Sequence, residues 1–369
     1  MSEVKRPLPR VGDNILNLVP YTPGKPISDV KREFGLTDVI KLASNENNLG
    51  PSPLAREAMR AALGTVNLYP DGSCFELRQA VAGLLACSPD QLIFGNGSDD
   101  LIRLLGLAFL QSGDEIVQDD PTFSQYEAAA VLNGAICHKV PNLNWAHHLD
   151  AMAERVGERT RIVFLTNPNN PTGTTVGARD VDSFMNRMPD ETLVVFDEAY
   201  FEYVERPDYP ASLNYVRDGR NVVVLRTFSK AYGLAGVRLG YGVTRSEIVR
   251  ILEQVREPFN VSVLAQAAGI AALRDVDHLR RTREMNHAGK CAFYAAFDAL
   301  GLAYAPSDAN FVWVDVKRDS RTLAGELMRR GVIVRAGAAF GAPTHLRVTV
   351  GLPEENARFI RELKEVLGT

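Results

Sequence analysis

The chain has 369 residues, 46% of them hydrophobic and 23% charged, and its formal net charge is −4 at pH 7. This composition is ordinary for a globular protein, and the slight negative charge gives no reason to expect nucleic acid or an anionic membrane as a partner. The N-terminus lacks an apolar signal segment, and no apolar run approaches the roughly 18 residues of a membrane-spanning helix. We therefore expect a protein without a membrane anchor, folded as one large and one smaller domain.

The cysteine and histidine patterns give no indication of a metal site. The cysteines are scattered and form no Cys-x-x-Cys pair: Cys74, Cys87, Cys137 and Cys291. The six histidines include no metal-binding spacing such as His-x-x-x-His. Scattered cysteines argue against a zinc knuckle or a disulfide framework and favour a reducing compartment, so the expected location is the cytoplasm.

The first 35 residues contain five prolines. This segment is predicted to be an extended N-terminal arm, followed by a short helix that ends at Gly35. A short apolar run at 91–95 is predicted to be a buried strand. After this strand, Ser98 is predicted to cap a helix whose apolar face begins at Leu101.

Continuous apolar runs follow at 161–166, 193–196 and 221–225. Such runs are typical of parallel strands that are covered on both faces, because a strand with one solvated face alternates apolar and polar residues. A helix capped by Ser246 comes next, and a long helical pattern at 262–301 is interrupted by charged residues. These elements predict a doubly wound α/β region.

The C-terminal part has a different pattern. Strands are predicted at 311–314, 332–335 and 346–350, a helix at 320–330, and a final helix that opens with Pro353. This order predicts a smaller α+β unit. The expected domains are residues 1–35 as the arm and short helix, 60–265 as the large α/β domain, and 36–59 together with 266–369 as the small domain.

Three consecutive apolar strands each end near polar residues of different chemical capability. The first runs into Asn167-Pro-Asn-Asn170-Pro-Thr-Gly173, the second ends in Asp197-Glu-Ala-Tyr200, and the third runs into Thr227-Phe-Ser-Lys230. In open parallel sheets, ligands bind outside the carboxyl ends of the strands. A ligand there would meet an amide, a carboxylate with a phenol, and an amine.

Pyridoxal phosphate needs this set of groups. A carboxylate facing its ring nitrogen keeps that nitrogen protonated, an amide and a phenol bind its ring hydroxyl, and a lysine binds its aldehyde. The hydroxyls of Thr227 and Ser229 and the guanidinium of Arg238 are donors that a phosphate dianion would require. The turn Gly95-Asn-Gly97-Ser98-Asp99 adds backbone N–H groups at a helix N-terminus, where phosphate is favoured.

These residues resemble the motifs of the fold-type-I aminotransferases, which depend on pyridoxal phosphate and have an aspartate aminotransferase-like fold. The shared set is Asn170-Pro-Thr-Gly, Asp197-x-x-Tyr200, Ser229-Lys230 and Arg238. Finer motifs are similar to the histidinol-phosphate aminotransferase branch: Leu42-Ala-Ser-Asn45-Glu46-Asn47, Tyr69-Pro-Asp-Gly, Gly95-Asn-Gly-Ser-Asp, Pro121-Thr-Phe123 and Leu346-Arg347-Val-Thr-Val-Gly351. They follow in the right order from about Tyr21 to the C-terminus.

The resemblance implies a role for each residue of the cofactor site. Lys230 would bind the cofactor aldehyde and then move the proton at the substrate Cα, and Asp197 and Tyr200 would complete the catalytic set. Asp197 would pair with the ring nitrogen, while Asn170 and Tyr200 would bind the ring hydroxyl. Phe123 would stack on the ring, where many relatives have tyrosine or tryptophan. The residues implied to surround the phosphate are Gly97, Ser98, Asp99, Thr227, Ser229 and Arg238.

Other residues are implied to bind the substrate or to act across a subunit interface. Tyr69 would reach the cofactor phosphate of a neighbouring subunit, and Tyr21 would close that neighbour's substrate pocket. Both roles imply a homodimer with shared active sites. Asn45, Arg335 and Arg347 would bind the substrate, the two arginines as a clamp for its anionic group.

The resemblance leaves more than one substrate open. The branch implies transfer of the amino group of L-histidinol phosphate to 2-oxoglutarate, which gives imidazole acetol phosphate and L-glutamate in histidine biosynthesis. An aromatic amino-acid aminotransferase, acting on phenylalanine or tyrosine, is the alternative. A related lyase would decarboxylate threonine phosphate from the same lysine-bound cofactor.

An enzyme of another class, a nicotinamide-dependent oxidoreductase, fits the sequence less well. It would need Gly-x-Gly-x-x-Gly after a strand, and Asp100 stands where the third glycine belongs. No acidic residue at the end of a second strand is suited to bind the ribose. We therefore expect a pyridoxal-phosphate-dependent aminotransferase.

Overall fold

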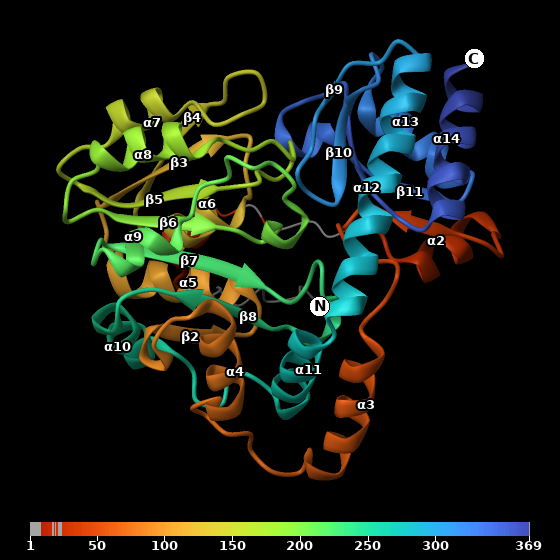
Figure 1. Cartoon of the computed structure of the whole chain (residues 1–369). Helices are drawn as coiled ribbons and strands as arrows, with labels where there is room; N and C mark the ends of the chain where they lie inside the picture. Colours follow the sequence, from red (N-terminus) through yellow and green to blue (C-terminus); the bar gives the residue numbers. More distant parts are fainter. Residues whose placement is uncertain (1–8, 17, 19, 21–23, 369) are drawn as a thin grey trace, which may run out of the picture.

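The computed structural model describes residues 9–16, 18, 20 and 24–368. Within this part of the chain the strands form two sheets, one of seven strands and one of five (Figure 1). In spatial order the larger sheet contains β2 (Leu92–Gly95), β8 (Gly240–Val243), β7 (Val222–Thr227), β6 (Leu193–Asp197), β5 (Thr160–Thr166), β3 (Glu115–Asp120) and β4 (Ile136–Pro141). Strand β8 runs antiparallel to both of its neighbours, and the other pairs are parallel.

Helices cover both faces of the larger sheet. One face packs against α5 (Ser98–Phe109), α6 (Gln125–Leu132) and α10 (Ser246–Val255). The other face packs against α3 (Pro53–Ala62), α4 (Phe75–Leu85), α7 (Leu149–Arg155), α8 (Ala178–Asn186), α9 (Leu213–Arg217) and α11 (Val263–Arg274). Adjacent strand residues point to opposite faces, so apolar runs such as Val194–Phe196 supply both cores. The predicted α/β class with a mainly parallel sheet is confirmed.

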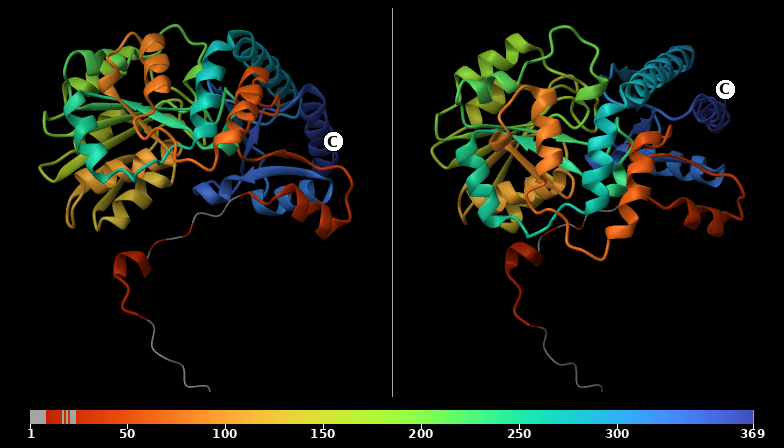
Figure 2. Two further views of the ribbon diagram at one scale, coloured as in Figure 1. Left: turned by 90° about the horizontal axis from the view of Figure 1, so that it is seen from below. Right: turned by 60° about the horizontal axis from the view of Figure 1, so that its bottom comes forward.

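The smaller sheet combines residues from both ends of the chain. Its strands, in spatial order, are β1 (Ile40–Leu42), β11 (Val332–Ala336), β12 (His345–Thr349), β10 (Phe311–Asp315) and β9 (Tyr304–Ala305). Helices α12 (Val276–Ala299), α13 (Ser320–Arg329) and α14 (Pro353–Leu367) bury Phe293, Leu327 and Phe359 against it. Helix α2 (Ile27–Phe34) joins them, so an N-terminal segment lies beside C-terminal helices (Figure 2).

The long helical pattern at 262–301 is divided into α11 and α12 at Asp275. Residues Ala265, Ala268 and Ala272 of α11 belong to the core of the larger sheet, whereas Phe293 of α12 packs on the smaller one. We therefore propose that the boundary between the two domains lies at Asp275 rather than at 265. Helix α3 packs with α11, and on the same argument it belongs to the large domain.

Helix starts differ from the predictions by one residue. The sequence predicts Ser98 as the cap of α5, but the N-cap is Gly97, whose φ is 85°. Glycine adopts this left-handed conformation without the steric cost that a Cβ imposes. Ser246 is likewise the first residue of α10, and Arg245 is its N-cap.

In the larger sheet, strands β3, β4 and β8 are absent from the sequence predictions because their residues are polar or glycine-rich; in the smaller sheet the short strands β1 and β9 are absent from them too. Glu115, Gln118 and Asp119 of β3 are buried, although carboxylates usually lie at the surface. Glu115 forms ion pairs with His138 of β4 and with Arg159 in the turn before β5. Burial of such a strand therefore depends on partners that the strand's own sequence does not reveal. No helix in the described part of the chain is both long and apolar enough to cross a membrane.

Candidate active site

A cavity of about 270 Å³ lies at the carboxyl ends of β5, β6 and β7. Residues of both sheets line it, since Arg347 belongs to β12 and Asp197 to β6. Its lining includes these predicted site residues: Asn45, Ser98, Asp99, Phe123, Asn170, Asp197, Tyr200, Thr227, Ser229, Lys230, Arg238 and Arg347. Residues that lie up to about 300 positions apart in the sequence thus share one cavity, at the edge of the sheet where the strand-end residues were expected.

Lys230 follows β7 and is half-buried in the cavity wall. Its Nζ donates a hydrogen bond to the backbone oxygen of Ser44 at 3.3 Å. Burial and the positive charge of Arg347 lower the pKa of Lys230 to about 8. A larger fraction of this amine is therefore uncharged near neutral pH than of an exposed lysine, and the uncharged amine is the nucleophile.

Asp197 is the last residue of β6 and is 2% exposed. Its Oδ2 accepts a hydrogen bond from the hydroxyl of Tyr126 at 2.6 Å, and its Oδ1 accepts one from the backbone N–H of Ala199 at 3.1 Å. Burial raises the pKa of Asp197 to about 6, against the opposing effect of these two hydrogen bonds. The carboxylate is thus held in a fixed orientation beside the cavity.

A group of donors suited to an anion lies at the N-terminus of α5. Arg238 donates from Nη1 to the hydroxyl of Ser229 at 3.4 Å, and its Nη2 lies 3.5 Å from the Asp99 carboxylate. Thr227 donates to Ser229 at 3.0 Å. Gly97 lies against the Arg238 guanidinium, and a Cβ at this position would collide with it. Ser98 is the first residue of the helix, where backbone N–H groups and the helix dipole favour a phosphate.

Asn45 connects the small sheet to Tyr200. Its side-chain Nδ2 donates to the Tyr200 hydroxyl at 2.9 Å, and its backbone N–H donates to Thr349 Oγ1 at 2.9 Å. The hydroxyl of Thr349 donates in turn to Asn45 Oδ1 at 3.1 Å. Asn45 has a φ of 55°, in the left-handed region that asparagine tolerates better than most residues.

Arg347 is 6% exposed and forms part of the cavity wall. Its Nη2 donates to the backbone oxygen of Ala43 at 2.8 Å, and its Nη1 donates to Asn170 Oδ1. Arg335 lies directly opposite Arg347 in the antiparallel pair of β11 and β12. Arg335 is not among the residues that line the cavity and lies over the ring of Phe340, 5.8 Å from its centre.

Seven lining residues were not predicted for the site, and two of them, Tyr126 and Thr166, contact its central groups. Tyr126 comes three residues after Phe123 at the start of α6, and the two rings meet edge to face with centroids 5.7 Å apart. Thr166 is the last residue of β5 and donates to the Tyr126 hydroxyl at 2.8 Å. The position of Thr166 at a strand end is a signal that could have identified it, whereas nothing in the local sequence reveals the contact of Tyr126 with Asp197.

A buried ion pair supports this end of β5. His147 Nε2 lies 2.6 Å from the backbone oxygen of Thr166, and its Nδ1 lies 3.1 Å from the Asp119 carboxylate. A carbonyl oxygen can only accept, so Nε2 carries a hydrogen, and the carboxylate favours a second hydrogen on Nδ1. Burial acts to lower the pKa of His147, but the charge of Asp119 and the hydrogen bonds to Asp119 and Thr166 together raise that pKa. These contacts give His147 a structural role at the end of β5.

Tyr69 lies outside the cavity lining. It is 83% exposed, and its ring stacks on Phe259, with centroids 4.7 Å apart. Two exposed aromatic rings in contact form a rigid apolar feature on the surface. Tyr21, the other residue predicted to act on a neighbouring subunit, lies outside the described residues.

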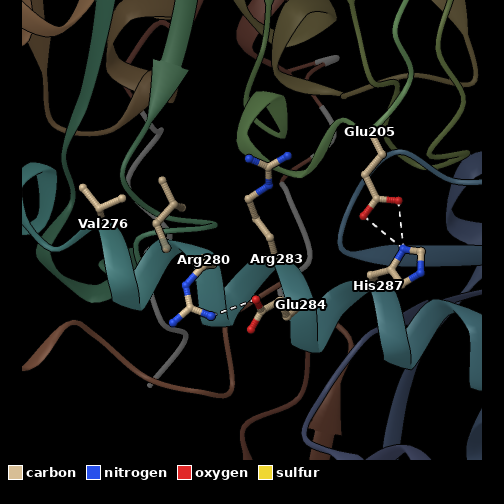
Figure 3. A pocket seen from close by; sticks show the side chains of 7 residues that line it. Glu205, Val276, Arg280, Arg283, Glu284 and His287 are labelled. Atoms are coloured by element: carbon tan, nitrogen blue, oxygen red, sulfur yellow. Dashed lines mark hydrogen bonds and ion pairs between the residues drawn. The ribbon is translucent and has the colours of Figure 1, made fainter.

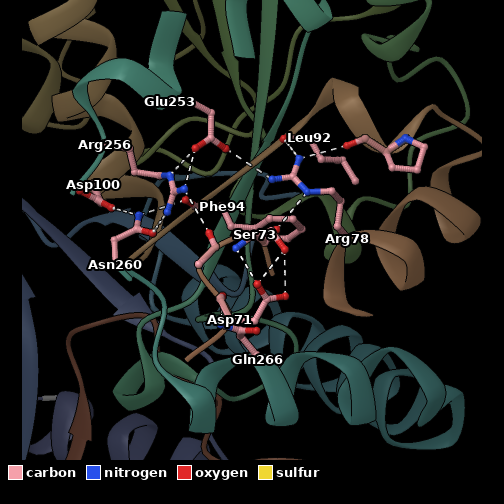
Figure 4. Close-up of polar contacts among 12 residues, drawn as sticks. Asp71, Ser73, Arg78, Leu92, Phe94, Asp100, Glu253, Arg256, Asn260 and Gln266 are labelled. Atoms are coloured by element: carbon pink, nitrogen blue, oxygen red, sulfur yellow. Dashed lines mark hydrogen bonds and ion pairs between the residues drawn. The ribbon is translucent and has the colours of Figure 1, made fainter. Parts of the chain in front are cut away.

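A polar network fixes the segment next to Tyr69 (Figure 4). Arg256 donates from Nη2 to the backbone oxygen of Gly72 at 3.1 Å and from Nη1 to Asn260 Oδ1 at 2.8 Å. Asn260 Nδ2 donates to Asp100 Oδ2 at 3.0 Å, in the first turn of α5. The segment that carries Tyr69 and the helix start at the cavity are thus held by one set of contacts.

A second cavity, of about 460 Å³, lies beside α12 (Figure 3). Four of its polar side chains form two pairs: Arg280 with Glu284 at 2.8 Å, and His287 with Glu205 at 3.0 Å. Among the residues that the structure describes, none of those predicted for the site lines this cavity. Most of the residues predicted for the site line the cavity around Lys230 instead.

Comparison with known sequences supports this assignment. The family model described as aminotransferase class I and II matches residues 37–363. The chain is 53% identical over 361 residues to the histidinol-phosphate aminotransferase of Moorella thermoacetica, with 98% of this chain and 94% of that protein covered. It is 49% identical to the histidinol-phosphate aminotransferase of Symbiobacterium thermophilum, with 96% of this chain and 98% of that protein covered.

Solved structures show the same relationship. The structure of histidinol-phosphate aminotransferase from Sinorhizobium meliloti, in complex with pyridoxal-5'-phosphate, superposes with a TM-score of 0.91 at 30% identity, covering 98% of each chain. An aspartate aminotransferase of Thermus thermophilus (TM-score 0.82, 23% identity, 96% of this chain and 100% of that chain covered) shares the fold. The chain therefore has the fold of the type I aminotransferases and belongs to the class I and II aminotransferases, within them to the histidinol-phosphate aminotransferase family.

Proposed function

We propose that the protein is a pyridoxal-phosphate-dependent aminotransferase that transfers the amino group of L-histidinol phosphate to 2-oxoglutarate, giving imidazole acetol phosphate and L-glutamate. The observation that carries this proposal is that one cavity contains the Lys230 amine, the Asp197 carboxylate and two arginines, Arg238 and Arg347. Each arginine can hold one anionic group, so the cavity is suited to a phosphorylated cofactor together with an anionic substrate.

The residues of the cavity fit pyridoxal phosphate. Lys230 is the amine for the aldehyde, and the buried Asp197 is the carboxylate for the ring nitrogen. The donors around Arg238 are suited to the phosphate, and Phe123 offers an aromatic face for the ring. When bound, the cofactor supplies an aldehyde that captures the substrate amine and a ring that withdraws electrons from the substrate Cα.

Two further side chains orient the reacting groups. Asn45 donates to the Tyr200 hydroxyl and so orients the phenol that would bind the ring hydroxyl of the cofactor, with Asn170 as the second partner. With the substrate bound, the Lys230 amine would carry the proton at the substrate Cα. Arg347, which contacts Asn170, would bind the anionic group of the substrate, and Arg335 on the neighbouring strand would complete the clamp.

The first test is the visible absorption spectrum of the purified protein, recorded before and after addition of L-histidinol phosphate without a keto acid. A yellow protein that is bleached by L-histidinol phosphate and recovers its colour with 2-oxoglutarate is the expected result. Bleaching by phenylalanine or tyrosine alone would move the assignment to the aromatic aminotransferases. A protein that stays colourless with added pyridoxal phosphate would contradict the cofactor assignment itself.

The protein is further proposed to act as a homodimer with shared active sites. Tyr69 is exposed, lies outside its own cavity and is held in place by the network around Arg256, as expected for a residue that reaches into a neighbouring subunit. Tyr21 is proposed to reach the same neighbouring site. A cytoplasmic location is also proposed, because Cys74, Cys87, Cys137 and Cys291 are all free thiols, which suits a reducing compartment.

Hybrid dimers test whether Tyr69 acts across the interface. One subunit carries Lys230→Ala and the other Tyr69→Phe, which keeps the ring on Phe259 but removes the hydroxyl. If Tyr69 serves the partner, one site of the hybrid has both native residues, so we expect half of the wild-type activity per dimer and wild-type affinity for pyridoxal phosphate at that site. If the only active site shows the weaker cofactor affinity of the Tyr69→Phe homodimer, Tyr69 serves its own subunit.

A further inference from the structure

Tyr126 is fully buried and held rigidly beside the cavity. Its ring stacks on Phe164 of β5, with centroids 4.4 Å apart and an interplanar angle of 11°. Phe123 contacts the same ring edge to face. Packing on two sides fixes the position of the phenol. Its hydroxyl can therefore form hydrogen bonds only with the groups directly next to it.

The hydroxyl of Tyr126 is the middle member of a chain of hydrogen bonds in which each group donates to the next. Thr166 Oγ1 donates to the Tyr126 hydroxyl at 2.8 Å, and that hydroxyl donates to Asp197 Oδ2 at 2.6 Å. A phenol has a single hydrogen to donate. Because Thr166 supplies a donor to the phenolic oxygen, the hydrogen of Tyr126 is directed to the carboxylate.

The second oxygen of Asp197 is also held. The backbone N–H of Ala199 donates to Oδ1 at 3.1 Å. Donors on both oxygens stabilise the charged form of a carboxylate and fix the plane of the group. Burial and the like charges of Asp99 and Glu198 act in the opposite direction, towards the protonated acid.

We propose that Tyr126 is a positioning residue that keeps Asp197 ionised and aimed at the ring nitrogen of the cofactor. This inference rests on the proposed function, because it assigns Tyr126 a task only if pyridoxal phosphate occupies the cavity. Tyr126 does not itself carry out a chemical step. Its effect on the reaction passes through Asp197, whose charge keeps the ring nitrogen protonated and the ring electron-withdrawing.

The test compares Tyr126→Phe with the wild type, both loaded with cofactor labelled with ¹⁵N in the ring. Phenylalanine preserves the stacking on Phe164 and removes only the hydroxyl. A hydrogen bond to a charged group contributes a factor of about 10 to 100 to an equilibrium, so loss of the hydroxyl should raise the proton affinity of Asp197 by that factor and shift the pH at which the ring nitrogen loses its proton. The ¹⁵N chemical shift followed against pH measures that midpoint without reference to activity.

Kinetics provide a second readout. In Tyr126→Phe we expect kcat to fall by about tenfold or more while KM for L-histidinol phosphate changes little, because the hydroxyl acts on the cofactor rather than on the substrate. Thr166→Val, which removes the donor to Tyr126, should shift the ¹⁵N midpoint in the same direction by a smaller amount. Tyr215→Phe is the matched control, because Tyr215 also stacks on a strand phenylalanine, Phe196, and donates to an aspartate, Asp182, yet does not line the cavity.

Each outcome decides the question. A midpoint in Tyr126→Phe equal to those of the wild type and Tyr215→Phe would overturn the proposal and leave Tyr126 a packing residue. If Tyr126→Phe fails to fold, Thr166→Val decides, and an unchanged midpoint there overturns the proposal in the same way. A wild-type protein that binds no pyridoxal phosphate would instead contradict the proposed function, so the two failures are distinguishable.

Discussion

Lys230→Ala is expected to lower turnover of L-histidinol phosphate by about 10²- to 10⁴-fold while the protein still binds pyridoxal phosphate. The loss follows because the variant lacks the amine that carries the proton at the substrate Cα, and a positioned group of this kind contributes up to about 10⁴-fold. Cofactor binding should persist, since Asp197 and the donors around Arg238 remain. Formation of L-glutamate from 2-oxoglutarate measures turnover, and absorbance after gel filtration measures the bound cofactor.

Lys290→Ala is the matched control for this experiment. Lys290 is also buried, and its Nζ donates to the backbone oxygen of Ser307 at 2.8 Å, but it does not line the cavity. Its loss should affect stability and leave the turnover of the folded protein close to that of the wild type. Turnover by Lys230→Ala at the wild-type rate would contradict the mechanism proposed for this site.

The reaction of Lys230 with the cofactor should also depend on pH. Only the uncharged amine attacks an aldehyde, and the pKa of Lys230 is lowered to about 8 from its usual 10.5 by burial and by the charge of Arg347. The rate at which the cofactor-free protein binds pyridoxal phosphate covalently should therefore rise as pH increases and level off above about 8. A rate that still rises steeply beyond pH 10 would show that the amine is not perturbed in this way.

Arg347→Ala is expected to weaken the binding of L-histidinol phosphate by about 2–5 kcal/mol, the range for loss of one partner of a buried charge pair. Arg347 is 6% exposed and anchored by Ala43 and Asn170, so its charge is fixed and poorly screened by water. The ratio kcat/KM for L-histidinol phosphate measures the effect. Arg347→Lys, which keeps the charge but not the two-pronged guanidinium, should retain part of the affinity.

L-histidinol, which lacks the phosphate, separates a phosphate contact from a general defect. If Arg347 binds the phosphate, the wild type and Arg347→Ala should use L-histidinol equally poorly, because neither has the interaction to lose. Arg335→Ala should have a smaller effect than Arg347→Ala, since Arg335 lies on the neighbouring strand outside the cavity lining. Equal values of kcat/KM for L-histidinol phosphate in the wild type and Arg347→Ala would remove Arg347 from the substrate site.

The fold was largely predictable because hydrophobic periodicity reports burial. The runs at 161–166, 193–196 and 221–225 correspond to β5, β6 and β7, three adjacent central strands of the larger sheet. The polar strand β3 was missed because its buried carboxylates are compensated by His138, His147 and Arg159, and that compensation exists only once the chain has folded. A local hydrophobic pattern predicts burial correctly only where a residue can be buried without a partner from a distant part of the chain.

The site was predictable to the extent that each chemical group lies in a local motif. Lys230, Asp197 and Asn170 each follow a recognisable strand, and parallel pairing brings the carboxyl ends of those strands to one edge. Asn45 and Arg347 reach the same cavity from the other sheet, and their presence there follows from the packing of the two sheets. Tyr69 and Arg335, whose roles were implied by the resemblance, lie outside the lining of this subunit's cavity.

By itself, the sequence determined which chemical groups the protein has and at which strand ends they occur, because covalent order and periodicity are local properties. The tertiary structure determines which of these groups come into contact and which protonation state each of them favours. Tyr126 contacts Asp197, 71 positions away, and Arg347 contacts Asn170, 177 positions away. Burial in the shared cavity then lowers the pKa of Lys230 and raises that of Asp197, since desolvation disfavours the charged form of each group. Such shifts arise from surroundings that only the folded chain assembles.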